Sequence, residues 1–435
     1  MKATFTKMFL FFSSFRFSFV GCAKKVVFLY VLLFPLLGFS QLDVVNKGLQ
    51  IKNTNDSVVV FGNFHHDAAT SAQDGTIDND GHFYISGNWI NNNSSTGQIF
   101  TSGRSGWVHL DSAVQTITGT AMTRFNKLEL GGNSDSTKYL VGVDAEVEDT
   151  LALNNHEFNI DGNTVTVLGV DTFLITRTSG FISSTDEGGL ARNTSNNQTY
   201  SFPVGSSVGT TRYRPVDILP TTADPNTYKV GMRNYDADID NFTRTTKEAT
   251  VGDINDRFYH KVSRINGATP IDITVYFHDS ADVIDGVYDI LAYWADVSEW
   301  KNPGEVGTAV PENSEGLVGL KTFGFDNFLT TPSTPVALSY DVLIDGQIFV
   351  ANVFSPNGDG FNDLIFARGK ALISVEFVIY DRWGAKVFET NDITKGWDGT
   401  KNGEQLNTAV FVYVVKGKFK NGDEVTQKGN ITLLK

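Results

Sequence analysis

The sequence predicts a nearly all-β protein. Apolar residues alternate with polar residues at a period of two through most of the chain, which is typical of strands that bury one face. Examples of this alternation are Leu49 and Ile51, Val58 and Val60, Leu128 and Leu130, and Val165 and Val167. The alternating runs are short and are separated by segments rich in Asn, Asp and Gly, the residues that favour tight turns. No convincing stretch has the period of an amphipathic helix.

Residues 41–175 are predicted to form a β-solenoid-like repeat region. Short strand candidates occur at 82–90, 107–110, 115–119, 125–130, 149–153 and 158–167. Polar turns separate them roughly every ten residues, which is the pattern that a coiled stack of short strands needs at its corners. The region resembles the β-solenoid passengers of secreted bacterial surface proteins. An antiparallel sandwich is the alternative, because one sequence specifies strands better than their pairing.

Residues 176–340 are predicted to form a single β-sandwich. The strand candidates at 213–218, 272–278 and 288–294 are more widely spaced than those before them, and prolines stand near the ends of several strands. This texture is typical of antiparallel sandwiches. Residues 330–335 contain two prolines and are predicted to be a linker to the C-terminal domain, since proline stiffens the chain and removes a backbone donor.

The charge of the chain excludes one class of partner. The 435 residues carry 35 basic and 49 acidic side chains, and the formal net charge is −14. Such an acidic surface repels phosphate backbones, so we expect no nucleic-acid partner. The single cysteine, Cys22, lies in the N-terminal segment, and the mature chain is therefore expected to contain neither a disulfide nor a cysteine nucleophile.

Residues 1–40 are predicted to be a signal peptide. Lys24 and Lys25 precede an apolar run at 26–37, and small residues follow, with cleavage expected near Ser40 and Gln41. Apolar runs long enough to span a bilayer do not recur later, so we expect no membrane span in the mature chain.

The C-terminal segment, residues 345–435, contains three motifs in a fixed order. The motifs are Ser355-Pro356-Asn357-Gly358-Asp359-Gly360, Arg382-Trp383-Gly384 and Trp397-Asp398-Gly399. Their order and spacing resemble the gliding-motility-associated C-terminal domain, which is the type B sorting domain of the bacterial type IX secretion system. At 406–413 the chain departs from this family, because the expected Pro or Gly-Thr-Tyr step is missing. The turn at these residues is therefore not assigned by the resemblance.

The resemblance implies a small immunoglobulin-like β-sandwich and a route of export. The chain would cross the inner membrane by its N-terminal signal and the outer membrane after the type IX secretion machinery recognises the folded domain. From the residue types, we expect Trp383 and Trp397 to anchor the small core.

Asn357, Asp359 and Asp363 form a candidate calcium site, and calcium is the only cofactor that the sequence suggests. Their spacing matches positions three, five and nine of an EF-type loop. The same register puts Phe366 at position twelve, where a bidentate carboxylate is required. A truncated calcium loop and a turn closed by Asn and Asp side chains both fit this pattern.

Other candidate chemistry receives a structural interpretation. Residues 205–209 match the G-x-S-x-G nucleophile pattern, but no helix start follows, so a glycine-rich turn is expected. The seven histidines have no metal-binding or catalytic-triad spacing. Trp294 and Trp300 are expected in the core rather than on a sugar-binding surface. We therefore predict no catalytic residues.

These observations predict a protein exported to the cell surface or the medium. The favoured function is a non-enzymatic adhesin or surface component that binds surface glycans or other surface proteins. The alternative is a secreted polysaccharide-acting enzyme with a β-solenoid passenger. An enzyme would require acids, bases or Tyr clustered on one solenoid face, which the linear sequence does not display.

Overall fold

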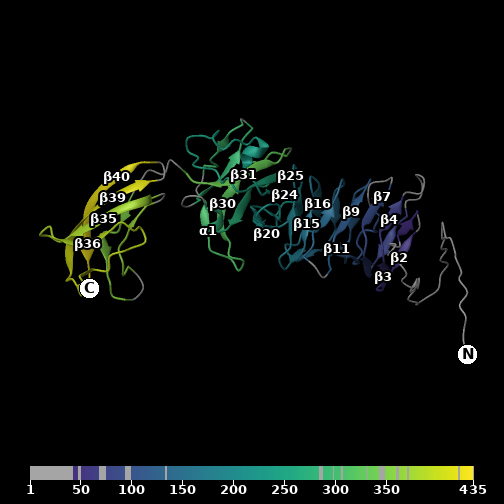
Figure 1. Cartoon of the computed structure of the whole chain (residues 1–435), viewed down its shortest axis with the longest axis horizontal. Coiled ribbons are helices and arrows are strands. Elements are labelled where there is room, and N and C mark those ends of the chain that lie inside the picture. The colour runs from purple at the N-terminus through teal and green to yellow at the C-terminus, as the bar shows by residue number, and fades with distance from the viewer. Residues whose placement is uncertain are drawn as a thin grey trace, which may run out of the picture. The chain divides into compact units, whose positions relative to one another are not determined.

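The computed structural model is almost entirely β (Figure 1). It describes residues 43–47, 50–67, 75–93, 99–132, 135–283, 288–296, 298–304, 307–330, 332–341, 348–358, 362–369, 372–419 and 422–434. Within these ranges the helices are η1 (Ala237–Asp240), a 3-10 turn, and α1 (Asp279–Asp282). None of the described helices is long and apolar enough to span a bilayer. The all-β prediction is confirmed, whereas the predicted signal peptide lies outside the described residues.

The N-terminal region is a parallel β-solenoid of about six turns, as predicted. The first face contains β1 (Val44–Asn46), β4 (Phe64–Asp67), β7 (Trp89–Asn92), β9 (Gln115–Gly119), β12 (Lys138–Leu140), β15 (Glu157–Asn159) and β18 (Phe181–Ser183). The second contains β10 (Thr123–Phe125), β13 (Ala145–Val147), β16 (Thr164–Val167) and β19 (Gly189–Thr194), and in the first turns β2 (Ile51–Asn53) and β5 (Ile77–Asn79) form a separate two-stranded sheet. The third contains β3 (Ser57–Val60), β6 (His82–Ile85), β8 (Trp107–Leu110), β11 (Lys127–Leu130), β14 (Leu151–Asn154) and β17 (Ile175–Arg177).

Alternate side chains of each strand fill the solenoid core. Phe64 lies opposite Trp89 in the parallel register, and their stacked ring centres are 4.8 Å apart. Phe100 and Phe125 each contact Trp89 with ring centres 5.4 Å apart. Because side chains alternate between the two faces of a strand, the period of two seen in the sequence places one row inside and one outside.

Asparagine side chains join successive turns at the corners of the solenoid. The buried Asn53 amide donates to Asn79 Oδ1 at 2.9 Å, and the Asn79 amide donates to the Trp107 carbonyl at 3.1 Å. Asn91 donates to the Met122 carbonyl at 2.8 Å. Buried amides need such partners, and a parallel stack supplies them because each turn repeats the position of the last. The Asn-rich turns of the sequence are therefore structural.

The second solenoid face continues directly into the next region. Strand β19 pairs in parallel with β16 and antiparallel with β24 (Asn226–Arg233). The same sheet then runs through β25 (Tyr259–Asn266), β31 (Thr334–Ser339), β27 (Ile290–Trp294) and β28 (Trp300–Lys301). The predicted division between residues 175 and 176 falls inside the parallel ladder, because β18 and β19 still stack on β15 and β16.

A second antiparallel sheet completes the central sandwich. It contains β20 (Tyr200–Phe202), β23 (Val216–Pro220), β26 (Ile271–Phe277), β30 (Val318–Phe325) and β29 (Thr308–Val310). Strands β21 (Gly205–Ser206) and β22 (Arg212–Tyr213) form a separate pair. One core extends from Val60 in the solenoid to Leu338 in the sandwich.

The predicted linker at residues 330–335 is wrong. Thr334 and Pro335 begin β31, which is buried along its whole length between β25 and β27. Pro335 is tolerated because it lies near the start of the strand, opposite Lys261 of β25 and before the first residue that pairs with β27.

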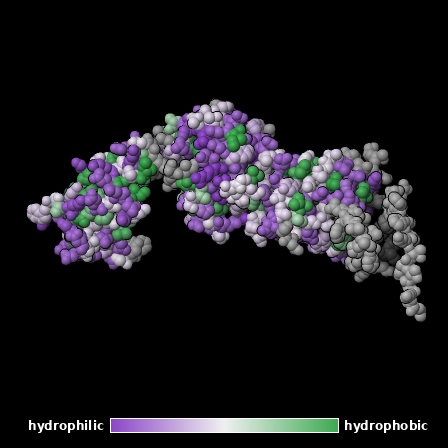
Figure 2. Space-filling view, viewed as in Figure 1, coloured by the Kyte–Doolittle hydropathy of each residue, from purple (hydrophilic) through white to green (hydrophobic). Residues whose placement is uncertain are grey.

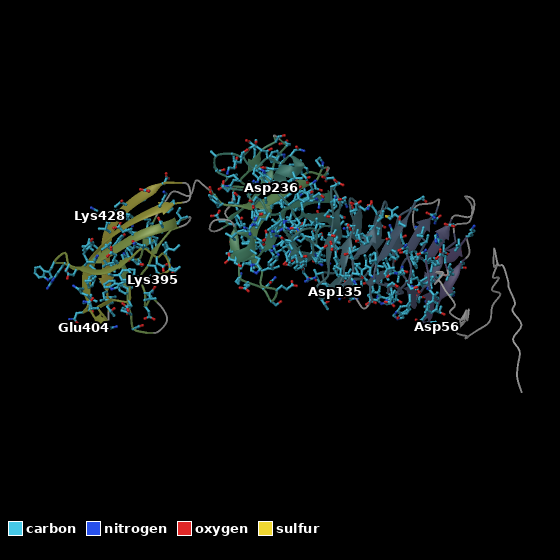
Figure 3. The ribbon with its side chains drawn as sticks, in the orientation of Figure 1. Asp56, Asp135, Asp236, Lys395, Glu404 and Lys428 are labelled. Atoms are coloured by element: carbon cyan, nitrogen blue, oxygen red, sulfur yellow. The ribbon has the colours of Figure 1, made fainter. Side chains whose placement is uncertain are left out.

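The C-terminal domain is a small β-sandwich with its own core, as predicted. One sheet has the order β33 (Val353–Phe354), β40 (Glu424–Leu433), β39 (Ala409–Phe419), β35 (Leu372–Tyr380) and β36 (Lys386–Thr390). Two further pairs are β32 (Phe349–Val350) with β34 (Ala367–Arg368), and β37 (Thr400–Lys401) with β38 (Glu404–Gln405). The outer surface of this domain mixes hydrophilic and hydrophobic side chains (Figure 2). Lys428 of β40 and Glu404 of β38 are among its exposed charges (Figure 3).

Candidate functional sites on the C-terminal domain and the solenoid

The Arg382-Trp383-Gly384 motif forms the tip of the hairpin between β35 and β36. The Asp381 carboxylate accepts hydrogen bonds from the backbone N–H groups of Trp383 and Ala385, both at 2.9 Å. The Gly384 N–H donates to the Asp381 carbonyl at 2.9 Å. Gly384 has a φ of +78°, a conformation that glycine adopts without strain. The turn is therefore held by its own hydrogen bonds.

Trp383 is 81% exposed, so the prediction that it anchors the core is wrong. The residue lies at the hairpin tip, beyond the last paired residues of the two strands, and the core is supplied instead by Phe377 and Ile379 of β35. The Arg382 guanidinium lies 5.0 Å from the centre of the Trp383 ring. The motif thus presents an aromatic ring and a cation to solvent.

Trp397 anchors the core, as predicted. It is 1% exposed, and its ring centre lies 5.3 Å from that of Phe354 and 4.9 Å from that of Phe411. Its indole N–H donates to the Thr400 carbonyl at 2.8 Å. The Asp398 carboxylate accepts from the Thr400 N–H at 2.9 Å, which closes the turn after the tryptophan.

The loop that begins at Ser355 packs beside this turn. A Cβ added at Gly399, whose φ is +78°, would lie 3.2 Å from Pro356 Cγ. The structure therefore brings the first and third motifs together. The Gly358 N–H donates to the Asp363 carboxylate at 2.7 Å, and the Ser355 N–H donates to the Asn362 carbonyl at 3.0 Å. These bonds join the two described parts of the loop, residues 355–358 and 362–363.

Calcium binding by Asn357, Asp359 and Asp363 stays a prediction. Asp359 and Gly360 lie outside the described residues. In the part of the chain that the structure describes, no group of three or more His, Cys, Asp or Glu side chains is arranged to hold a metal ion.

Residues 348–433 match the family model described as the CHU_C Type IX secretion signal domain. The C-terminal sandwich is a type IX secretion signal domain. The resemblance drawn from the three motifs is confirmed, and the chain is a type IX secretion substrate destined for the cell surface or the medium. No curated protein and no solved structure matches the chain.

The part that this signal domain exports carries a second candidate site, on the outer face of the solenoid. Strands β6, β8 and β11 contribute two outward side chains each. The parallel register places His82, Trp107 and Lys127 in one row, and Tyr84, His109 and Glu129 in the next. These six side chains come from three successive turns.

A hydrogen-bonded chain runs through this site. His109 Nδ1 bonds the Glu129 carboxylate, and His109 Nε2 lies 2.8 Å from His82 Nδ1. The carboxylate requires a proton on His109 Nδ1, so in the neutral ring Nε2 is the acceptor and His82 Nδ1–H the donor. The lone pair of His82 is then on Nε2. Asn154 donates to the second Glu129 oxygen at 3.0 Å.

The same contacts set the electrostatics of this hydrogen-bonded chain of side chains. The hydrogen bond from His109 is the largest cause that lowers the pKa of Glu129; partial burial opposes it. His109 is 6% exposed, whereas His82 is exposed. The chain therefore leads from a carboxylate through a buried imidazole to an imidazole at the surface.

The rings of the site stack on one another. The Tyr84 and His109 ring centres are 4.3 Å apart with planes 12° apart, and those of His82 and His109 are 5.0 Å apart. The rings therefore cover each other's faces, and both ring nitrogens of His109 are bonded within the cluster. Sequence reasoning missed this cluster, since His82 and His109 are 27 residues apart and coincide only when the turns stack.

The remaining sequence candidates are structural. Ser207 follows the short strand β21, and its hydroxyl donates to the Glu157 carboxylate. The next described element is the strand β22 rather than a helix, and the first described helix, η1, begins only at Ala237, so residues 205–209 form a turn rather than a nucleophile elbow. Trp300 is fully buried and donates to the Phe242 carbonyl at 3.1 Å, while Trp294 is half-buried against it.

Proposed function

We propose that the exported chain is a non-enzymatic adhesin or surface component that binds glycans through the outer face of β6, β8 and β11. The observation that carries the proposal is the chain from Glu129 through His109 to the exposed His82, with Tyr84 beside it. These hydrogen bonds leave Nε2 of His82 as a fixed acceptor nitrogen. Sugar hydroxyls donate and accept hydrogen bonds, so they are suitable partners for the acceptor nitrogen of His82 and for the Tyr84 hydroxyl.

Strand spacing adds to this argument. Neighbouring parallel strands lie about 4.8 Å apart, so the two rows offer polar groups at a regular interval along the solenoid. A linear glycan presents its hydroxyl groups repeatedly along one direction. Multiple weak hydrogen bonds along such a row can be made without a deep cleft, as a surface-attachment protein requires.

A polysaccharide-acting enzyme is the second candidate, and the same hydrogen bonds from Glu129 through His109 to His82 favour it. A carboxylate that orients an imidazole is a common means of preparing a general base. His82 is exposed on the face of a sheet, however, whereas catalytic groups usually act in clefts that exclude water. This exposure is why binding is the preferred function.

Glycan retention and reducing-sugar release, measured on the secreted full chain, separate the two candidates. The adhesin predicts retention of at least one glycan without release of reducing ends, and release would establish the enzyme. His82→Ala should reduce retention at least tenfold. His65→Ala is the matched control, because His65 is half-buried on another solenoid face, 3.5 Å from Asp43. Failure of the wild type to retain any glycan would contradict the proposal.

A further inference from the structure

We infer that the hairpin at residues 381–385 is the element of the signal domain that the type IX secretion machinery contacts, with Trp383 entering an apolar pocket whose rim is acidic. This inference rests on the sorting role of the domain. It adds which residues of the domain the machinery recognises and what kind of protein surface binds them.

The exposure of Trp383 is the first step. Among the large hydrophobic side chains that the structure describes, Trp383 has the highest exposed fraction, 81%. Tryptophan buries more apolar surface than other side chains when a partner covers it, and it is enriched among the residues that dominate the affinity of interfaces. Its place at a hairpin tip makes the ring accessible from several directions.

The rigidity of the hairpin is the second step. Asp381 accepts from two backbone N–H groups of the turn, and its own N–H donates to the Ala385 carbonyl at 2.9 Å. Gly384 supplies the positive φ that the turn requires. A side chain on a preorganised turn loses little conformational freedom when it binds. Asp381 is therefore a positioning residue for Trp383.

Charge indicates the rim of the pocket. The Arg382 guanidinium lies over the Trp383 ring, 5.0 Å from its centre, so a partner that buries the ring also meets a cation. The carboxylate of Asp381 is directed to backbone donors of the turn. Residues 348–435 carry eleven basic and ten acidic residues, whereas the chain as a whole is acidic. An acidic rim would accept this domain and repel the rest of the chain.

An apolar strip extends the contact. Tyr380, the last residue of β35, pairs with Val412 of β39 at the end of the sheet where the hairpin begins. Val410 and Val412 are 54% and 42% exposed on the outer face of that strand. A partner that buries Trp383 can also cover this strip. Trp383 would then be the well-packed centre of the interface and the valines its less critical surround, an arrangement found in many interfaces.

The test measures export of the full chain in the cells that produce it, as the ratio of protein outside the cell to protein in the periplasm. Trp383→Ala should reduce this ratio at least tenfold, and Trp383→Phe should restore part of it. Phe349→Ala is the matched control, because Phe349 is an aromatic side chain of the same domain that is 68% exposed. Its export should equal that of the wild type.

The outcomes distinguish the inference from the sorting role. If deletion of residues 345–435 leaves export unchanged, the sorting role itself fails. If the deletion blocks export but Trp383→Ala does not, the hairpin inference alone is overturned, as it is if Phe349→Ala lowers export equally. The unfolding midpoint of purified Trp383→Ala should match the wild type, and a large drop would attribute the export defect to misfolding and overturn the inference.

Two further variants test the acidic rim and the type of partner. Arg382→Glu should reduce export more than Arg382→Lys, and equal export of both would overturn the acidic rim. The purified wild-type chain should not bind phosphatidylethanolamine vesicles. Vesicle binding that Trp383→Ala abolishes would assign the hairpin to a lipid surface instead and overturn the assignment to a protein pocket.

Discussion

The two tryptophans of the C-terminal motifs have opposite roles, and mutation of each should show it. Trp397→Ala removes a buried ring and is expected to lower the free energy of unfolding by about 3–5 kcal/mol. Trp383→Ala changes an exposed side chain and should alter it by less than about 0.5 kcal/mol. Denaturant unfolding of the purified chains checks both values. Equal losses would contradict this assignment of buried and exposed roles.

A second prediction at this scale concerns pH. Burial lowers the pKa of His260 to about 4, and its ring nitrogen Nε2 donates to the Arg214 carbonyl at 2.8 Å. An imidazole in the unfolded chain titrates near pH 6.5, so protons bind the unfolded state more tightly between these values. The free energy of unfolding therefore carries no penalty from His260 above about pH 6.5. It falls by up to about 3 kcal/mol as the pH is lowered towards 4.

Urea unfolding at pH 7 and pH 4.5 measures this effect, with His260→Gln as the control. The glutamine amide can still donate to the Arg214 carbonyl, but it does not titrate in this range. The difference in stability between wild type and variant should therefore shrink at the lower pH. A constant difference would show that His260 does not contribute to the pH dependence.

Local sequence shows which residues belong to turns, but it does not show which turn residues are buried. Trp383 and Trp397 both stand near a glycine that has a positive φ. Trp397 is buried because Ile365 pairs with it from a segment far along the chain and Phe354 and Phe411 enclose its ring. Those neighbours are supplied by tertiary structure. The outward orientation of Trp383 could not be derived from its motif for the same reason.

At the scale of elements, the corner asparagines should contribute measurably to the solenoid. Asn79→Ala removes the acceptor for the Asn53 amide and for the Gly81 N–H, and it removes the donor to the Trp107 carbonyl. We expect a loss of about 1–3 kcal/mol in the free energy of unfolding. Asn197→Ala, an exposed position in the turn after β19, is the control and should be nearly neutral. A neutral Asn79→Ala would show that the ladder is not needed.

Strand positions were largely predictable from the sequence. For strand pairing, the sequence predicted a parallel stack but not which residues lie opposite each other. The period of two located the outward and inward rows of β6, β8 and β11, but it could not show that His82 and His109 meet across a turn of the solenoid. Strand β31 was mistaken for a linker because Pro335 within it and Pro332 just before it weigh against a strand. It is nevertheless a central strand, since burial between two neighbours outweighs the local preference.

At the scale of the molecule, the described residues form two large cores and one smaller buried cluster. The first core extends through the solenoid and the sandwich, the second belongs to the signal domain, and the smaller cluster surrounds Trp300 in the sandwich. The solenoid and the sandwich share a sheet through β19 and β24, so a boundary between them cannot be recognised from a change in composition. The signal domain was recognisable because its turns require particular residues at fixed positions, such as Gly384 and Gly399.

The separate core of the signal domain leads to a prediction about the whole chain. Removal of residues 345–435 should leave the first core intact, because none of its residues lies beyond Leu338. The truncated protein should therefore fold but accumulate in the periplasm. Fractionation followed by immunoblotting measures its location, and protease resistance of the truncated chain shows that it is folded. Unchanged amounts at the surface or in the medium would contradict the role of the domain as the sorting signal, whereas a protease-sensitive product would show that the first core depends on the second.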